Sequence, residues 1–111
     1  MADLSEWTSQ LRRGLLELSI LSLLDRNPSY GYEIATKLGA IPPLAAGEGT
    51  IYPLLRRLRA EGFLETFWEE SEGGPPRQYY RITAPGRRHL KTIGQEWRAM
   101  AAGINGLLGP E

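Results

Sequence analysis

Hydrophobic and polar residues separate onto two sides of a helix predicted for residues 49–62. At about 100° per residue, one side is aliphatic and consists of Ile51, Leu54, Leu55 and Leu58. The other side is polar or basic for most of its length and consists of Tyr52, Pro53, Arg56, Arg57 and Ala60. Thr50 is a candidate N-cap, and Gly62 is the candidate residue at which the helix ends. A helix supported from behind, with cations in front, is the kind that enters the major groove of DNA.

A long helix is predicted near the start of the chain, over residues 4–26. Asp3 or Ser5 can serve as its N-cap, and the Asn-Pro pair at 27–28 stops it. Its apolar residues occupy two nearly opposite faces, a pattern typical of a helix that is buried on both sides. We expect one face to pack on the core of this chain and the other on a partner subunit.

A short second helix is predicted over residues 30–38. Ser29 is its candidate N-cap, and Gly39 is the residue that ends it. The following residues 40–47 include two consecutive prolines and form a stiff connector of ordinary length. The second helix and the helix over 49–62 are therefore close neighbours in the sequence, joined by a loop.

Two segments alternate apolar and polar residues in the manner of β-strands, residues 63–70 and residues 77–83. The residues between them, 71–76, read Ser-Glu-Gly-Gly-Pro-Pro, which no helix can cross. The sequence therefore predicts an antiparallel hairpin with a loose tip. Thr83 is expected to cap a last helix that has Pro85 in its first turn.

This last helix has the clearest periodicity in the chain. Its apolar residues recur at spacings of 3, 4, 3, 4 and 3, the a/d pattern of a coiled coil: Leu90, Ile93, Trp97, Met100, Ile104 and Leu107. Such a stripe can also close the core of a domain. Because three helices and a hairpin already supply a core here, we interpret the stripe as a homodimer interface, shared with the second face of the first helix.

The order helix, helix, helix, strand, turn, strand, helix is that of a winged helix-turn-helix followed by one more helix. The predicted fold class is mainly α with a small β-hairpin, an α+β arrangement. We expect residues 1–83 to form a winged helix-turn-helix DNA-binding domain and residues 84–111 to form a C-terminal dimerisation helix.

Composition narrows the chemistry that the chain can perform. Cysteine is absent from the 111 residues and His89 is the single histidine, which leaves no disulfide framework, no thiolate zinc site and no constellation for nucleophilic catalysis. We predict neither enzymatic activity nor a metal or cofactor. The N-terminus lacks a basic segment followed by a long apolar run, so no membrane association and a cytoplasmic location are expected.

The formal net charge is zero, which argues against a polyanionic partner, but the charges are unevenly distributed. Residues 77–91 carry five cations and no acid, and the helix over 49–62 adds three arginines. Glutamates are concentrated in residues 65–72, on the first strand and the turn of the hairpin. We expect this acidic strand to face away from DNA, so that only the turn and the second strand approach the duplex.

Seven residues are candidates for contact with double-stranded DNA: Lys37, Thr50, Tyr52, Pro53, Arg56, Arg57 and Arg77. Tyr52 can donate its hydroxyl hydrogen to a phosphate. Arg56 and Arg57 can reach phosphates or the O6/N7 edge of guanine. Lys37 suits a phosphate clamp, and Arg77 suits a narrow minor groove.

Other interpretations of the same residues remain open. Tyr52 can act only as a lid on the core, Arg59 can pair with Glu61 or Glu48, and Arg81 can pair across the strands with acids of the hairpin. At the level of the whole chain, a winged helix can also serve as a protein-interaction module that does not bind DNA. The zero net charge is the best support for that alternative.

Several segments of the chain, taken in order and spacing, resemble the PadR-type transcriptional regulators from Leu11 to about Leu108. They are Gly14-Leu15-Leu16-Glu17 with Ile20-Leu21, Tyr30-Gly31-Tyr32-Glu33-Ile34, residues 49–58 with Gly62, and residues 77–83 with Gly86. Tyr30 departs from the pattern, since the family usually has histidine there. The short C-terminus resembles the compact branch of the family, which has a single C-terminal helix.

The resemblance implies a homodimeric repressor that a small phenolic or drug-like effector releases from its operator. It also implies that the C-terminal helix builds the dimer and that an aromatic residue on it lines an effector pore. Trp97 lies in the matching part of this chain, with Leu11, Gly14 and Leu18 as neighbours, so a planar apolar ligand would stack between two Trp97 rings. The alternative is a core tryptophan that binds nothing. A dimer of this kind would read an inverted repeat whose half-sites lie about 34 Å apart.

Overall fold

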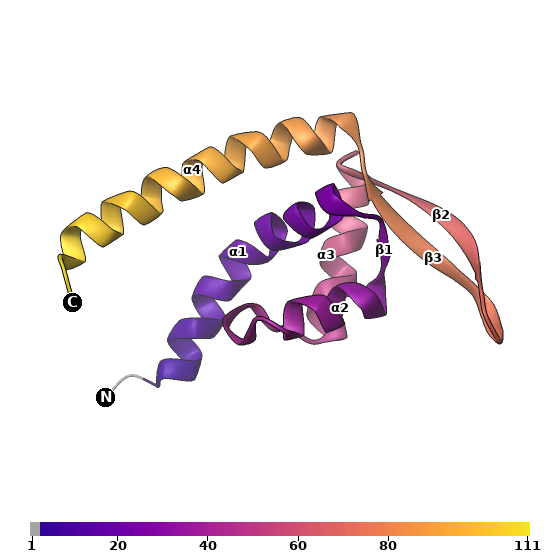
Figure 1. Ribbon diagram of the computed structural model, residues 1–111, viewed down its shortest axis with the longest axis horizontal. Coiled ribbons are helices and arrows are strands. Elements are labelled where there is room, and N and C mark those ends of the chain that lie inside the picture. Colours follow the sequence, from indigo (N-terminus) through magenta and orange to yellow (C-terminus); the bar gives the residue numbers. More distant parts are fainter. Residues whose placement is uncertain (1–2) are drawn as a thin grey trace.

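The computed structural model describes residues 3–111; residues 1 and 2, with which the predicted 1–83 unit begins, lie outside the described residues. The elements are α1 (Leu4–Arg26), β1 (Ser29–Tyr30), α2 (Gly31–Gly39), the short 3-10 helix η1 (Pro42–Leu44), α3 (Glu48–Ala60), β2 (Leu64–Ser71), β3 (Gly74–Ile82) and α4 (Ala84–Leu108). The hairpin of β2 and β3 projects from one end of the molecule, and α4 returns from it along the length of α1 (Figure 1). The predicted order of three helices, a hairpin and a last helix is confirmed.

The core lies where α1, α2 and α3 meet the base of the sheet. Its buried side chains are Leu16, Ile20, Leu21, Leu24, Ile34, Leu38, Ile51, Leu55, Leu58, Leu64, Tyr80 and Ile82. The aliphatic side of α3 is thus inside, as its pattern predicts, with Leu54 partly buried at its edge. This burial holds α3 from behind and fixes which residues of the helix face solvent.

Three predicted helix ends are confirmed by the cap geometry. The carboxylate of Asp3 accepts a hydrogen bond from the amide of Ser5 at the start of α1. The hydroxyl of Thr83 accepts one from the amide of Gly86 at the start of α4. After α3, Gly62 has φ +84°, a left-handed conformation that favours glycine because it has no Cβ.

Two predicted caps are wrong. Ser29 does not cap the second helix; it lies in β1, which pairs antiparallel with β3 and places Ser29 opposite Tyr80. Ser29 and Tyr30 form backbone hydrogen bonds with the edge of β3, and α2 begins only after them, at Gly31. Thr50 does not cap α3, because the helix begins two residues earlier and the Thr50 amide already donates to the carbonyl of Gly47.

The sheet has the order β1-β3-β2, with both neighbouring pairs antiparallel. Strand β3 begins at Gly74 and includes two prolines that the prediction placed in the turn. This part of β3 lies beyond the two-residue β1, so on that side no neighbour needs the missing proline amides. The turn is therefore shorter than predicted, and Gly73 has φ +69° there.

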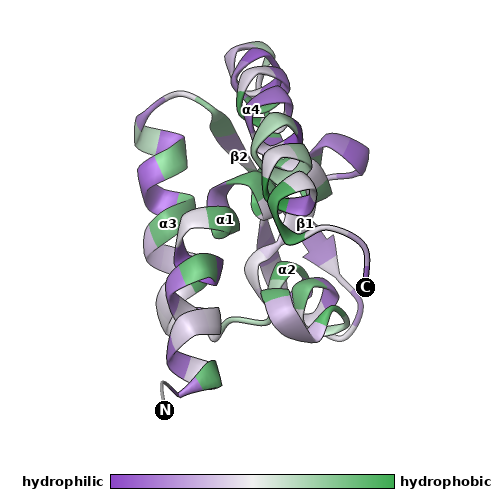
Figure 2. Cartoon of the chain, turned by 90° about the vertical axis from the view of Figure 1, so that its left-hand side faces the viewer, coloured by the Kyte–Doolittle hydropathy of each residue, from purple (hydrophilic) through white to green (hydrophobic). Residues whose placement is uncertain are grey.

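The long helices α1 and α4 each leave apolar side chains exposed on the single chain. On α1 these are Leu4, Trp7 and Leu11, which lie on one of its two apolar faces. Hydrophobic stretches alternate with hydrophilic ones along both helices (Figure 2). Despite these stretches, no helix within residues 3–111 combines the length and apolarity that a membrane span requires.

Gly86 is the point at which the first turn of α4 touches the loop before β2. A Cβ at this position would overlap the carbonyl oxygen of Phe63 and lie 2.8 Å from Ile82 Cγ1. We expect Gly86→Ala to lower the free energy of unfolding by about 1–3 kcal/mol, because backbone cannot move aside as a flexible side chain can. Urea unfolding at fixed protein concentration measures the change.

Gly39→Ala is the matched control, since it is the same substitution at a helical residue whose added Cβ would meet nothing within 4 Å. We expect it to be neutral or to stabilise by up to about 1 kcal/mol, because alanine favours the helical conformation. Equal effects of the two substitutions would contradict the close approach of α4 to the Phe63 carbonyl.

Candidate functional site

Two arginines of α3 are exposed and have no ion-pair or side-chain hydrogen-bond partner among residues 3–111, Arg56 on the outer face and Arg59 nearer its flank. Arg56 is exposed, and the ion pairs and side-chain hydrogen bonds found in residues 3–111 do not involve it. Thr50 and Pro53 are exposed on the same helix. Pro53 lies in the second turn of α3, since the helix begins at Glu48. This face can therefore offer a cation to an external anion.

Tyr52 braces α3 against α2. A Cβ on Gly31 would overlap the Tyr52 ring, so the ring lies directly on the start of α2, and its side chain is partly buried. Burial raises the pKa of the Tyr52 phenol, and the nearby charge of Glu48 raises it further. The phenol stays protonated and can donate a hydrogen bond, so its expected contact with a phosphate stays a prediction beside the bracing role.

Arg57, predicted as a DNA contact beside Arg56, makes two internal ion pairs that its pattern did not predict. Its Nη2 lies 2.7 Å from Oε1 of Glu17 on α1, and its Nη1 lies 2.6 Å from Oε1 of Glu61. These two hydrogen bonds hold the guanidinium on the side of α3 that faces α1 and raise its pKa. None of the ion pairs found in residues 3–111 joins Arg59 to Glu61 or Glu48, the two partners that the alternative interpretation gave it.

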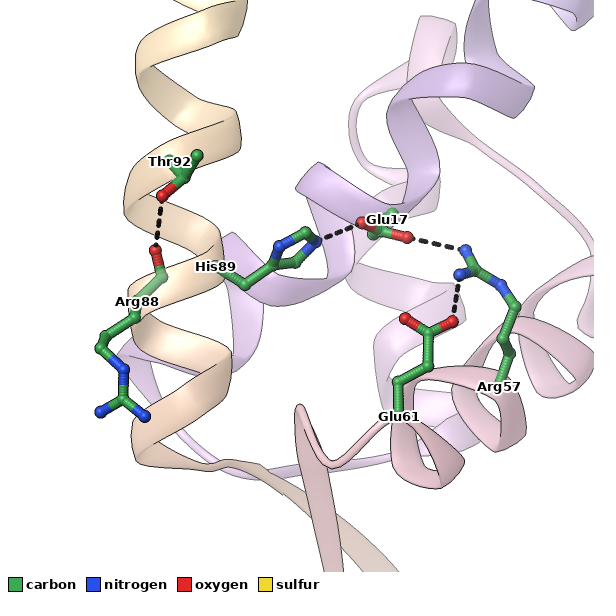
Figure 3. Close-up of polar contacts among 6 residues, drawn as sticks. All are labelled: Glu17, Arg57, Glu61, Arg88, His89 and Thr92. Carbon is green, nitrogen blue, oxygen red and sulfur yellow. Dashed lines mark hydrogen bonds and ion pairs between the residues drawn. The ribbon is translucent and has the colours of Figure 1, made fainter.

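Glu17 links α1, α3 and α4 through a hydrogen-bond network that was not predicted from the sequence (Figure 3). Its Oε1 accepts from Arg57 on α3, and its Oε2 lies 2.7 Å from Nε2 of His89 on α4. The His89 ring also stacks on Phe63, with 4.2 Å between ring centroids. The sequence signal was a single charged residue, Glu17, in a stretch of α1 that is otherwise uncharged, and its two partners are distant along the chain.

The environment of Glu17 favours the ionised carboxylate. Burial, the largest single effect, raises the pKa of Glu17, but hydrogen bonds from His89 and Arg57 and their positive charge together outweigh it. The net pKa lies below the ordinary value of 4.5. An ionised carboxylate only accepts hydrogen bonds, so Nε2 of His89 must carry the hydrogen that bridges them.

Low pH is expected to weaken the contacts of Glu17 with Arg57 and His89. Because folding lowers the pKa of Glu17, its contribution to stability is fully present above the unfolded value and is lost as pH falls through the lower folded pKa. We expect Glu17→Gln to be less stable than the wild type at neutral pH, and the gap to close toward pH ~3. Urea unfolding at several pH values measures it. Glu72→Gln, at an exposed glutamate of the hairpin turn, is the control; a gap that does not change with pH would contradict the account.

The register of the hairpin contradicts the expected separation of acidic and basic strands. Glu65 lies opposite Arg81, and Glu69 lies opposite Arg77. Directly opposed residues of an antiparallel pair project from the same face, so acids and cations share one side of the sheet. Arg81 Nε and Glu65 Oε1 form an ion pair at 2.9 Å, which confirms the cross-strand alternative for Arg81.

The two remaining candidates for DNA contact, Lys37 on α2 and Arg77 on β3, lie outside α3. Lys37 is on α2, with its Nζ 3.3 Å from the hydroxyl of the buried Ser29 and 3.4 Å from Oε1 of Glu33. Its side chain is still 42% exposed, so it can reach an external anion. Arg77 is exposed on β3, with its guanidinium over the ring of Tyr30.

The apolar stripe of α4 is divided by the structure. Leu90 and Ile93 are partly buried and pack on the core of their own chain, so part of the stripe predicted as a dimer interface also closes the chain's own core. Farther along the helix the exposed fractions are 38% for Trp97, 53% for Met100, 56% for Ile104 and 85% for Leu107. The reason is geometric, because α4 extends beyond the body of the molecule (Figure 1).

Two grooves border α4. One, of about 830 Å³, runs between α1, η1 and α4, and the other, of about 400 Å³, lies between α1, α3 and α4. Leu18 and Trp97 line both grooves, and Gly14 lines the smaller one together with the Glu17–Arg57 pair. Leu11, the fourth residue expected near an effector, lines neither groove.

Comparison with known proteins identifies relatives over most of the chain. Residues 20–92 match the model of the transcriptional regulator PadR-like family. A PadR family transcriptional regulator from Eggerthella lenta is 37% identical, with a TM-score of 0.82 over 96% of this chain and 93% of that one. A PadR-like transcriptional regulator from Bacillus cereus is 38% identical, with a TM-score of 0.84 over 92% and 99%. An uncharacterised protein from Lysinibacillus sphaericus is 32% identical over 91 residues, which are 80% of this chain and 84% of that protein.

Proposed function

Because this chain belongs to the PadR-like family of transcriptional regulators, we propose that it is a homodimeric repressor that binds an inverted-repeat operator. The family consists of DNA-binding regulators and not of enzymes. The observation that carries the proposal is α3, which buries Ile51, Leu55 and Leu58 completely while Arg56 projects into solvent. A rigidly held helix loses little freedom when it enters a major groove, and its arginine is ready for guanine or phosphate.

The proposed DNA surface consists of Lys37, Thr50, Tyr52, Pro53, Arg56 and Arg77. Arg56 reads base edges, while Lys37 and the phenol of Tyr52 contact phosphates on either side of the groove. Arg77 contacts the backbone or minor groove from the hairpin. Arg57 is not part of this surface, because its guanidinium supports α3 from the side.

The proposed dimer joins the exposed part of the α4 stripe to the exposed face of α1. Trp97, Met100, Ile104 and Leu107 on one helix and Leu4, Trp7 and Leu11 on the other give each chain two apolar surfaces that a second copy can cover. A two-fold axis would use both surfaces twice, as closed symmetric dimers do. It would also place two copies of Arg56 on the same side of the assembly, which suits an inverted repeat.

The proposed effector is a planar apolar molecule held near Trp97 at this interface. Gly14, Leu18 and Trp97 share one groove, and that groove also touches the Glu17–Arg57 pair that supports α3. A ligand that favours a different angle between α1 and α4 would change the distance between the two recognition helices and so weaken operator binding by population shift.

Trp97→Ala is expected to weaken the binding of planar apolar molecules. We expect the dye anilinonaphthalene sulfonate to bind the wild-type dimer and to lose at least about fivefold in affinity when the indole is removed, because stacking and buried area are lost together. Fluorescence titration measures this. Trp68→Ala, at an exposed tryptophan of the hairpin, is the control; equal losses for both variants would support the alternative in which Trp97 binds nothing.

A mobility-shift assay with the DNA upstream of the protein's own gene tests the proposed function. We expect saturable binding whose affinity falls steeply as salt is raised, because counterions are released from the phosphates. A flat response at micromolar dimer and low salt would instead favour a protein-interaction module. The cytoplasmic location of such a regulator stays part of the proposal.

A further inference from the structure

The outward face of the sheet carries a row of rings and guanidinium groups. The guanidinium carbon of Arg77 lies 4.5 Å from the centroid of the Tyr30 ring. Tyr30 meets Tyr79 edge-on at 5.4 Å, and Tyr79 stacks on Phe67 at 5.5 Å. Arg81 covers the far end of the row, 4.7 Å from the Phe67 centroid. Tyr30 is therefore held from behind by other rings, while its own face carries Arg77.

Arg77 has two neighbours on this face, and they differ in charge. Glu69 lies directly opposite it on β2. Tyr30 lies diagonally across on β1, because it pairs with Tyr79, two residues farther along β3. Among the ion pairs of residues 3–111, none joins Arg77 to Glu69. The guanidinium thus lies on the ring and not on the carboxylate.

The position of the Arg77 guanidinium, on the Tyr30 ring and not on Glu69, determines what Arg77 can bind. A salt bridge to Glu69 would occupy the N–H donors of the guanidinium and compensate its charge. Stacking on an aromatic ring uses the flat face of the group and leaves the donors at its edge available for hydrogen bonds. The neighbouring cation, Arg81, is already paired with Glu65, so Arg77 is the arginine of this face whose donors remain available.

We infer that Tyr30 is a positioning residue for DNA binding: its ring holds the guanidinium of Arg77 away from Glu69 and available to a phosphate. The inference rests on the proposed function, because it assigns a role within the proposed DNA surface. It depends on the π face of residue 30 and not on its size or its hydroxyl group.

Two substitutions separate the ring from the bulk of the side chain. Tyr30→Leu keeps apolar volume but removes the π face, and we expect it to lower affinity for the upstream DNA about three- to tenfold. It should also reduce the slope of log affinity against log salt by about 0.9 for each lost phosphate contact. Tyr30→Phe keeps the ring and should restore both values. Circular dichroism melting of each variant shows whether the fold is retained.

A second-site substitution identifies Glu69 as the competitor. In the Tyr30→Leu background, Glu69→Gln removes the carboxylate that Arg77 would otherwise meet, and we expect affinity and salt slope to return toward the wild type. Wild-type binding with no effect of Tyr30→Leu, or a loss that Glu69→Gln leaves unchanged, would overturn the positioning role alone. Absence of binding by the wild type would overturn the proposed function and the positioning role with it.

Discussion

Replacing Met100 and Ile104 together by aspartate is expected to convert the protein to monomers that no longer bind operator DNA. Both side chains are more than half exposed on the single chain, so the two charges do not disturb the chain's own core. They would, however, be buried without partners if α4 met a second copy, and unpaired buried charges are strongly unfavourable. Because two linked half-site contacts would become one, affinity should fall at least about a hundredfold.

Sedimentation velocity measures the dimer, and fluorescence anisotropy with labelled DNA measures binding. Ala99→Asp with Ala102→Asp is the matched control, since it adds the same two charges at exposed residues on another side of α4. We expect this control to remain dimeric. A Met100 and Ile104 variant that still sediments as a dimer would show that the exposed stripe is not the interface.

Arg56→Ala is expected to weaken operator binding while leaving stability unchanged. The side chain is exposed on α3 and has no ion-pair partner among residues 3–111. Loss of an arginine contact to a guanine edge or phosphate costs about 1–3 kcal/mol per subunit, so the dimer should lose at least tenfold in affinity. The melting temperature of the free protein should be nearly the same as that of the wild type.

The adjacent substitution Arg57→Ala is the natural counterpart, because it makes the same chemical change one residue along the helix. It removes two hydrogen bonds and leaves the partly buried carboxylate of Glu17 with His89 as its remaining side-chain partner. We expect a clear fall in melting temperature. If Arg56→Ala destabilised the protein and Arg57→Ala did not, the orientation of α3 described above would be wrong.

Features set by local sequence were the ones that could be predicted. The buried side of α3 follows from helical periodicity, and Gly62 and Thr83 mark helix ends because their chemistry acts on neighbouring residues. The strand β1 could not be predicted in the same way. It has two residues, too few for any alternation, and its partner in β3 lies about fifty residues away.

The candidate site likewise includes features that local sequence predicts and features that depend on distant residues. The exposure of Arg56 follows from its place on the helix, but the inward turn of Arg57 depends on Glu17, forty residues earlier in the chain. His89 and Phe63 join that junction only because α4 folds back over α1. The mixture of acids and cations on the sheet depends on strand register, which places Glu69 opposite Arg77. Contacts made by tertiary packing have no signature in a local pattern.

Selection of duplexes from a random DNA library by the purified dimer tests the central claim most directly. If two copies of α3 read DNA together, the enriched sequences should share a two-fold symmetric motif with half-site centres about 10 base pairs apart. Arg56→Ala should lose preference at a defined position within each half-site. Recovery of no common motif, or of a single asymmetric site, would contradict the proposal that two copies of α3 bind DNA as a symmetric pair.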